Sequence, residues 1–99
     1  MPRAGLLLLL CVGPALAQEP AVIARSLAAT CANCHGTDGR TVDGSAIPSL
    51  VGMPKDYMVL QLKAFKEGTR PATVMHQITK GLTEEQVNTI ATYYSTTKR

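Results

Sequence analysis

The motif Cys31-x-x-Cys34-His35, followed by Gly36, constrains this chain more than any other stretch. The spacing C-x-x-C-H is typical of covalent haem attachment. Two thiols at this spacing lie about one helical turn apart. Each can therefore form a thioether with a vinyl group on the same edge of the porphyrin. The histidine that follows offers an imidazole nitrogen to the iron as an axial ligand.

Two other chemistries use paired cysteines, namely a structural zinc site and a thioredoxin-like redox pair. Zinc needs four ligands, usually with a second Cys or His pair at similar spacing. After position 35 the chain has no further cysteine and only His76. A thioredoxin motif needs a βαβ setting, and no alternating strand pattern is present. The motif therefore predicts haem c, bound through Cys31 and Cys34.

The first 17 residues have the pattern of a secretory signal peptide. Residues 1–3 carry a positive charge, residues 5–12 are apolar, and residues 15–17 read Ala-Leu-Ala, a small-x-small cleavage site. The apolar run is far shorter than the roughly 20 residues that span a bilayer, so we expect no membrane span. Cys11 has no small residue beside it on its N-terminal side, which argues against a lipoprotein site. The sequence thus predicts a signal peptide at 1–17 and one haem domain at 18–99.

Export to the periplasm agrees with the motif, because haem is attached to such motifs outside the bacterial cytoplasm. Removing residues 1–17 leaves only Cys31 and Cys34 as cysteines. It also leaves nine basic and seven acidic residues, a formal charge of +2. This charge is too mild for nucleic-acid binding, and no basic cluster argues otherwise. A domain this short buries little surface, so an attached apolar cofactor would contribute much of its core.

Hydrophobic spacing predicts an all-α fold. We expect helices over residues 20–33, 55–67 and 74–80, and a last helix that starts after Thr83. Gly68 has the position of a helix C-cap, and Thr83 to Gln86 has the form of a capping box. Residues 36–54 are rich in Gly, Asp, Ser, Thr and Pro, which indicates a loop. Apolar positions recur at i, i+3, i+4 and i+7 in the first and last helices: Ala24, Leu27, Ala28 and Cys31, and Val87, Ile90, Ala91 and Tyr94.

The opposite axial position of the iron has several candidate ligands after His35. Met58 lies within a helical stripe, where methionine usually fills the core. Met53 is only 18 positions beyond His35, whereas Met75 is 40 beyond it. The longer separation gives the chain length to return on the far face of the haem. Spacing alone favours Met75 and leaves Met53, the His76 side chain and an open position as alternatives.

The whole of residues 18–99 resembles a class I c-type cytochrome, a small helical fold whose N- and C-terminal helices pack around one haem. The resemblance rests on the haem motif and on several positions that follow it. It implies an iron held by His35 and Met75. It also implies that the Pro48 carbonyl accepts the proton on the other histidine nitrogen, and that Leu50 packs against the porphyrin. The matching positions are Ile47-Pro48-x-Leu50-x-Gly52, Met75 and Tyr93-Tyr94.

A narrower stretch is similar to the haem subunit of flavocytochrome c sulfide dehydrogenases. It comprises Phe65-Lys66-x-Gly68-x-Arg70, Thr73-Val74-Met75 and Ile78-x-Lys80-Gly81-x-Thr83-x-Glu85-Gln86. This resemblance implies a one-electron carrier that takes electrons from a flavoprotein partner. The flavoprotein would hold the sulfide-oxidising chemistry, so the haem chain itself would have no catalytic residue.

Two alternatives stay open. The same stretch also resembles free cytochromes of the c4 and c553 kind, which exchange electrons with other redox proteins. A five-coordinate haem enzyme or gas sensor would require that Met75 does not bind iron.

Overall fold

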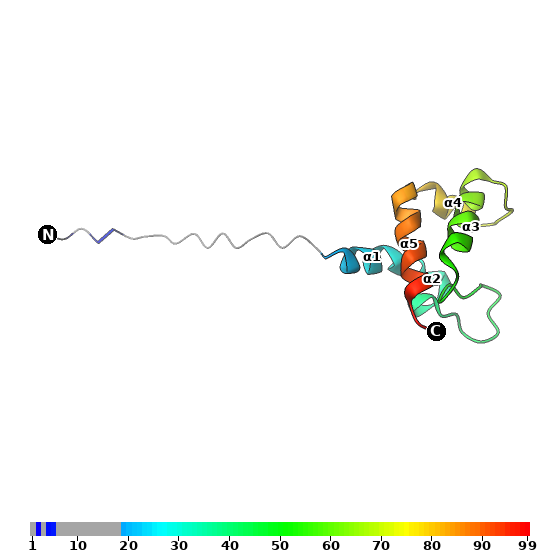
Figure 1. The fold of residues 1–99 in the computed structure, drawn as a ribbon, viewed down its shortest axis with the longest axis horizontal. Coiled ribbons are helices and arrows are strands. Elements are labelled where there is room, and N and C mark those ends of the chain that lie inside the picture. The colour runs from blue at the N-terminus through cyan, green and yellow to red at the C-terminus, as the bar shows by residue number, and fades with distance from the viewer. Residues whose placement is uncertain (1, 3, 6–18) are drawn as a thin grey trace.

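A computed structural model describes residues 2, 4, 5 and 19–99 of the chain, and in these residues every regular element is helical. The predicted all-α fold is confirmed (Figure 1). Most of the predicted signal peptide lies outside the described residues. No helix in the described part is long and apolar enough to cross a membrane. In chain order the elements are α1 (Pro20–Ala29), α2 (Ala32–His35), the 3₁₀ turn η1 (Thr37–Gly39), α3 (Lys55–Glu67), α4 (Met75–Lys80) and α5 (Glu84–Thr96).

The first helix ends earlier than its apolar spacing predicts. We expected one helix over residues 20–33, and this extent was wrong: α1 stops at Ala29, and α2 begins separately at Ala32. The Thr30 hydroxyl donates to the Leu27 carbonyl at 2.8 Å, and the Thr30 amide donates to the same oxygen at 3.3 Å. A hydroxyl that bonds the local backbone competes with the helical pattern. The tightened turn therefore breaks the helix just before Cys31.

Helix α3 begins and ends where its local signals predict, and α5 begins where its capping box predicts. Gly68 follows α3 with φ +80°, the left-handed conformation that glycine adopts at low cost. At the start of α5 the Thr83 hydroxyl accepts from the Gln86 amide at 3.1 Å. The Gln86 side chain accepts in return from the Thr83 amide at 2.9 Å. This reciprocal pair is the predicted capping box.

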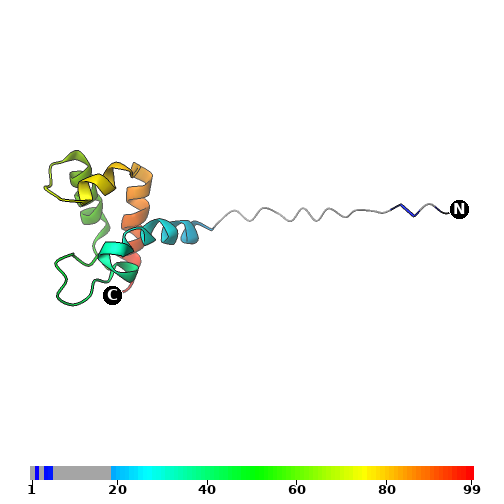
Figure 2. The ribbon, with the colours of Figure 1, turned by 180° about the vertical axis from the view of Figure 1, so that it is seen from behind.

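The core lies where α5 packs across α1 and α3 (Figures 1 and 2). The Tyr94 hydroxyl donates to the Ala28 carbonyl at 2.5 Å and joins α5 to α1 across 66 positions of sequence. On α3, Met58 and Leu62 are buried, whereas Tyr57 and Leu60 on the same helix are exposed. The buried residues of the cluster are Ala28, Met58, Leu62, Val87, Ile90, Ala91 and Tyr94.

Candidate haem site

The two cysteines of the motif lie in different surroundings around the short helix α2. Cys31 is the residue that caps this helix at its N-terminus, and it is half-buried against the core. Burial raises the pKa of its thiol, and a hydrogen bond from Thr30 partly offsets this rise. Cys34 is exposed, and both thiols are free. Each cysteine therefore has a sulfur that is free to form a thioether.

His35 ends α2 and is held by the backbone of a distant loop. Its side chain is only 8% exposed. The His35 Nδ1 atom lies 2.7 Å from the Pro48 carbonyl oxygen. Because a carbonyl oxygen only accepts, the proton of a neutral imidazole sits on Nδ1, and the lone pair is left on Nε2. Metal-ligating histidines are commonly held in this tautomer by a backbone carbonyl.

A sharp turn after His35 makes this contact possible. Gly36 has φ +86°, and a Cβ at this position would lie 1.9 Å from the Arg40 carbonyl oxygen. Only glycine allows the backbone to approach so closely. The turn leads into η1, so that Gly39 is brought beside the segment that follows Pro48.

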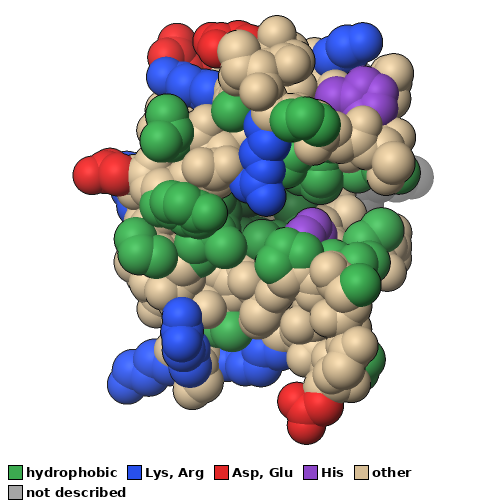
Figure 3. Space-filling view, turned by 90° about the vertical axis from the view of Figure 1, so that its right-hand side faces the viewer, with side chains coloured by type: hydrophobic (Ala, Val, Ile, Leu, Met, Phe, Trp, Pro, Cys, Tyr) green, Lys and Arg blue, Asp and Glu red, His purple; other side chains and the backbone are tan. Residues whose placement is uncertain are grey.

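Apolar side chains gather around a hollow that crosses one face of the molecule (Figure 3). The partly buried residues packed against the core include Leu50, Met53, Met75 and Leu82. Among the candidate axial ligands, Met58 is 3% exposed inside the core cluster. Met53 and Met75 are both only partly buried. His76 is also partly buried, and its Nδ1 atom has no hydrogen-bond partner in the described chain.

This donor set fits a covalently attached haem. Two free thiols stand one turn apart, the adjacent imidazole has Nε2 free for a metal, and thioether and aliphatic side chains supply an apolar wall. Within the described residues, no group of three or more His, Cys, Asp or Glu side chains meets. The structure brings His35 and Pro48 together. The roles of Pro48, Leu50 and Met75 at the haem stay predictions.

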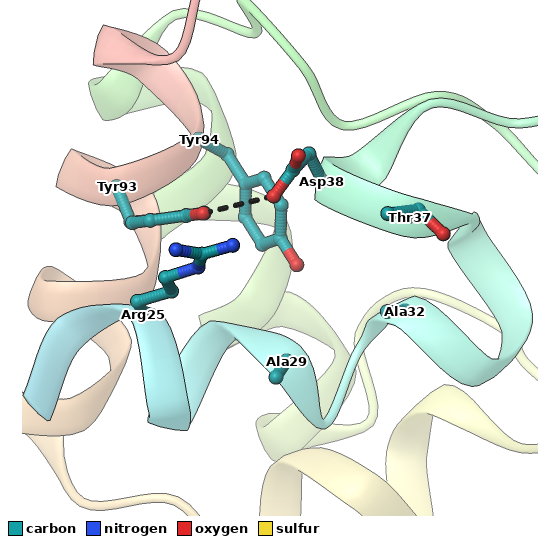
Figure 4. A pocket seen from close by; sticks show the side chains of 7 residues that line it. All are labelled: Arg25, Ala29, Ala32, Thr37, Asp38, Tyr93 and Tyr94. Atoms are coloured by element: carbon teal, nitrogen blue, oxygen red, sulfur yellow. Dashed lines mark hydrogen bonds between the residues drawn. The ribbon is translucent and has the colours of Figure 1, made fainter. Parts of the chain in front are cut away.

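A small cavity of about 160 Å³ lies between α1, η1 and α5, beside the haem motif (Figure 4). The Tyr93 hydroxyl donates to Asp38 Oδ1 at 3.1 Å, and Asp38 Oδ2 lies 3.6 Å from Arg40 Nη1. Asp38 has φ +54° in this turn. Burial and the hydrogen-bonded Asp38 carboxylate raise the pKa of Tyr93. The bond from Tyr93 thus ties the turn after the haem motif to the last helix.

Sequence reasoning missed a hydrogen bond between two residues that follow His35 and Pro48 in the chain. The Ser49 hydroxyl donates to the Gly39 carbonyl at 2.7 Å. Both residues fall in the segment expected only to be a loop. A serine directly after Pro48 is a weak signal, because nothing local indicates that Gly39 lies within its reach.

Comparison with known proteins agrees with this site. The family model described as Cytochrome c matches residues 22–98. The cytochrome subunit of sulfide dehydrogenase from Chlorobaculum tepidum is 44% identical over 68 residues, which cover 69% of this chain and 60% of that protein. The thiosulfate dehydrogenase electron acceptor from Thiomonas intermedia is 41% identical over 71 residues, covering 72% of this chain and 33% of that protein. Cytochrome c-554(548) from Halomonas halodenitrificans is 38% identical over 69 residues, covering 67% of this chain and 82% of that protein.

Proposed function

We propose that the iron of this chain is held by His35 and Met75 and receives single electrons from a flavoprotein sulfide dehydrogenase subunit. The proposal starts from what the comparisons show: the chain belongs to the cytochrome c family, carries covalently bound haem c and has an electron-transfer role. The observation that supports His35 as a ligand is the 2.7 Å contact between His35 Nδ1 and the Pro48 carbonyl, whereas Met75 is proposed from its spacing and from the resemblance. This contact holds a proton on Nδ1 and leaves Nε2 as a donor to the metal.

Each residue of the site has a defined task in this proposal. When bound, the haem supplies an iron that changes by one electron between the ferrous and ferric states. Cys31 and Cys34 would hold the porphyrin through thioethers, and His35 Nε2 and the Met75 thioether would be the protein donors to its iron. Thioether ligation would favour the ferrous state. Leu50 would pack against the porphyrin, as the resemblance implies.

Replacing Met75 tests the ligand pair. We expect Met75→Ala in purified holoprotein to lose the low-spin six-coordinate spectrum and to bind carbon monoxide in the ferrous state. Met53→Ala is the matched control, because Met53 is also a partly buried methionine packed against the core, and its spectrum should be unchanged. An unchanged spectrum in Met75→Ala would refute the assignment. Uptake of carbon monoxide by the unmutated ferrous protein would instead support an open-site enzyme or sensor.

The flavoprotein partner is proposed from two observations. Residues 65–86 resemble the haem subunit of flavocytochrome c sulfide dehydrogenases, and a relative bearing the name of that subunit is 44% identical. The chain spans 60% of this relative and 33% of the thiosulfate dehydrogenase electron acceptor. Gentle purification from the source tests the proposal, and we expect a flavin-containing protein to accompany the chain. A flavin-free monomer would count against it.

A free soluble carrier is the second candidate. One observation favours it, since the matched region covers 82% of cytochrome c-554(548), a protein of comparable length. Three basic side chains on and after α3 already bond within the chain. Lys63 lies 3.3 Å from Glu84, Lys66 donates to the Leu82 carbonyl, and Arg70 donates to Gln61. Transient redox encounters bury little area, so a free carrier needs no extensive docking face.

We also propose that the protein works in the periplasm after removal of residues 1–17. Haem attachment outside the cytoplasm and the composition of these residues support this location. The mass of the mature holoprotein tests it. We expect a chain that begins at Gln18 and carries one haem, whereas a retained N-terminus would contradict the proposal.

A further inference from the structure

We propose that Ser49 is a positioning residue for the haem iron, acting through Pro48 and His35. The inference rests on the proposed ligation by His35. It assigns to the Ser49 hydroxyl the task of aiming the Pro48 carbonyl at the histidine proton. In this way a side chain that need not touch the haem would help to set its reduction potential.

Residues 49–51, which directly follow Pro48, share a single hydrogen-bond acceptor. The Gly39 carbonyl accepts from the Ser49 hydroxyl at 2.7 Å, from the Leu50 amide at 2.8 Å and from the Val51 amide at 3.3 Å. Gly39 itself is held in place. Its φ is +77°, and a Cβ there would lie 2.7 Å from the Tyr94 ring and 3.0 Å from the Leu50 Cβ. The acceptor is therefore a rigid point of attachment.

Gly39 is also rigidly connected to His35. The Gly36 amide donates to the Ala32 carbonyl at 3.0 Å, and the Gly39 amide donates to the Gly36 carbonyl at 2.9 Å. These bonds link α2 to η1 in one short turn. The distance from the histidine to the Gly39 carbonyl is thus set by the haem motif, and whatever is fixed to that carbonyl is fixed relative to the imidazole.

The segment before Pro48 offers no comparable support. Residues 42–49, Pro48 and Ser49 among them, are all exposed, so the two sides of Pro48 differ in their hydrogen bonds and not in their burial. The hydrogen bonds found there are local: the Ser45 amide donates to the Val42 carbonyl at 3.2 Å, and the Ile47 amide donates to the Ser45 hydroxyl at 3.1 Å. Pro48 is therefore held from its C-terminal side. Ser49 is the first residue on that side, and its side chain and the next amide share one acceptor.

The chemical consequence follows from the His35 Nδ1–H bond. A well-aimed carbonyl draws the proton away from the imidazole and makes Nε2 a stronger donor, which favours ferric iron. Without the Ser49 hydroxyl, the Leu50 and Val51 amides still hold the segment, but the Pro48 carbonyl has more angular freedom. The bond to Nδ1–H then weakens, and the equilibrium between ferric and ferrous iron shifts toward the ferrous state.

The experiment compares four holoproteins: wild type, Ser49→Ala, Ser49→Thr and Ser45→Ala. We expect Ser49→Ala to increase the equilibrium constant for reduction about threefold, which at 59 mV per tenfold change corresponds to a potential about 30 mV higher. The ferrous-state NMR resonance of the His35 Nδ1 proton should move, and this proton should exchange faster with solvent. Ser49→Thr keeps a hydroxyl and should retain the wild-type potential and resonance.

Ser45→Ala is the matched control, because it removes a hydrogen-bonded serine hydroxyl from the same loop without touching Gly39. A shift as large in this variant as in Ser49→Ala would overturn the proposal. An unmoved potential and Nδ1 resonance in Ser49→Ala, or a shifted potential in Ser49→Thr, would overturn it as well. If Ser49→Ala yields no folded holoprotein, the Thr variant and the control still decide. Failure of the ligand assignment is separate, since it appears in the spectrum of the unmutated protein and of Met75→Ala.

Discussion

Removal of the Tyr94 hydroxyl should lower the free energy of unfolding by a small amount, because it removes one hydrogen bond between α5 and α1. Tyr94 is 1% exposed, and its hydroxyl donates to the Ala28 carbonyl at 2.5 Å. In Tyr94→Phe the ring remains, so no cavity opens. The Ala28 oxygen also keeps the Cys31 amide at 3.0 Å, so it is not left without a partner. The loss is therefore that of one buried hydrogen bond, about 1 kcal/mol.

Equilibrium unfolding in urea measures this loss. For a domain of this size, about 1 kcal/mol corresponds to a midpoint lower by roughly 0.5–1 M. Haem absorbance and far-ultraviolet circular dichroism should give the same transition. Tyr57→Phe is the control, since Tyr57 is 48% exposed, and its midpoint should not change. Equal midpoints for Tyr94→Phe and wild type, or an equal loss in Tyr57→Phe, would refute the reasoning.

Three further predictions concern the same fold. Thr83→Ala removes the acceptor of the Gln86 amide and should lower the free energy of unfolding by about 1 kcal/mol, measured by urea unfolding. Gly39→Ala places a Cβ at φ +77° and 2.7 Å from the Tyr94 ring. It should cost about 2–4 kcal/mol in the same assay, and a loss below that range would contradict the strain argument. Burial raises the pKa of Tyr94 above its ordinary value of 10.0, so the unfolded chain releases this proton first. Stability should therefore fall as the pH rises above about 10, and fall less steeply in Tyr94→Phe.

Local signals predicted the later half of the fold well. The bounds of α3 and the capping box at Thr83 follow from residues within one or two turns of each helix end. The break before Cys31 was not predicted, because the apolar stripe continues through it. Only the Thr30 hydroxyl, which bonds the Leu27 carbonyl, marks where the helix stops.

The residues of the candidate site also differ in whether local sequence could predict them. Spacing identified Cys31, Cys34 and His35, because their chemistry depends on adjacent positions. Resemblance supplied Pro48, whose contact with His35 spans 13 positions. The bond from Ser49 to Gly39 could not be foreseen, since a three-dimensional turn brings the two residues together and neither has a distinctive sequence pattern.

The packing of α1 against α5 also bears on the order in which the chain folds. Four of the seven buried core residues lie on α5: Val87, Ile90, Ala91 and Tyr94. The haem motif and α1 come earlier in the chain, so α1 has no packing partner until α5 is present. Because α1 and α5 are far apart in the sequence, the contacts between them form only after the whole intervening chain is present. We therefore expect the Cys31 and Cys34 thiols to stay accessible for thioether formation until α5 docks against α1 and completes the core.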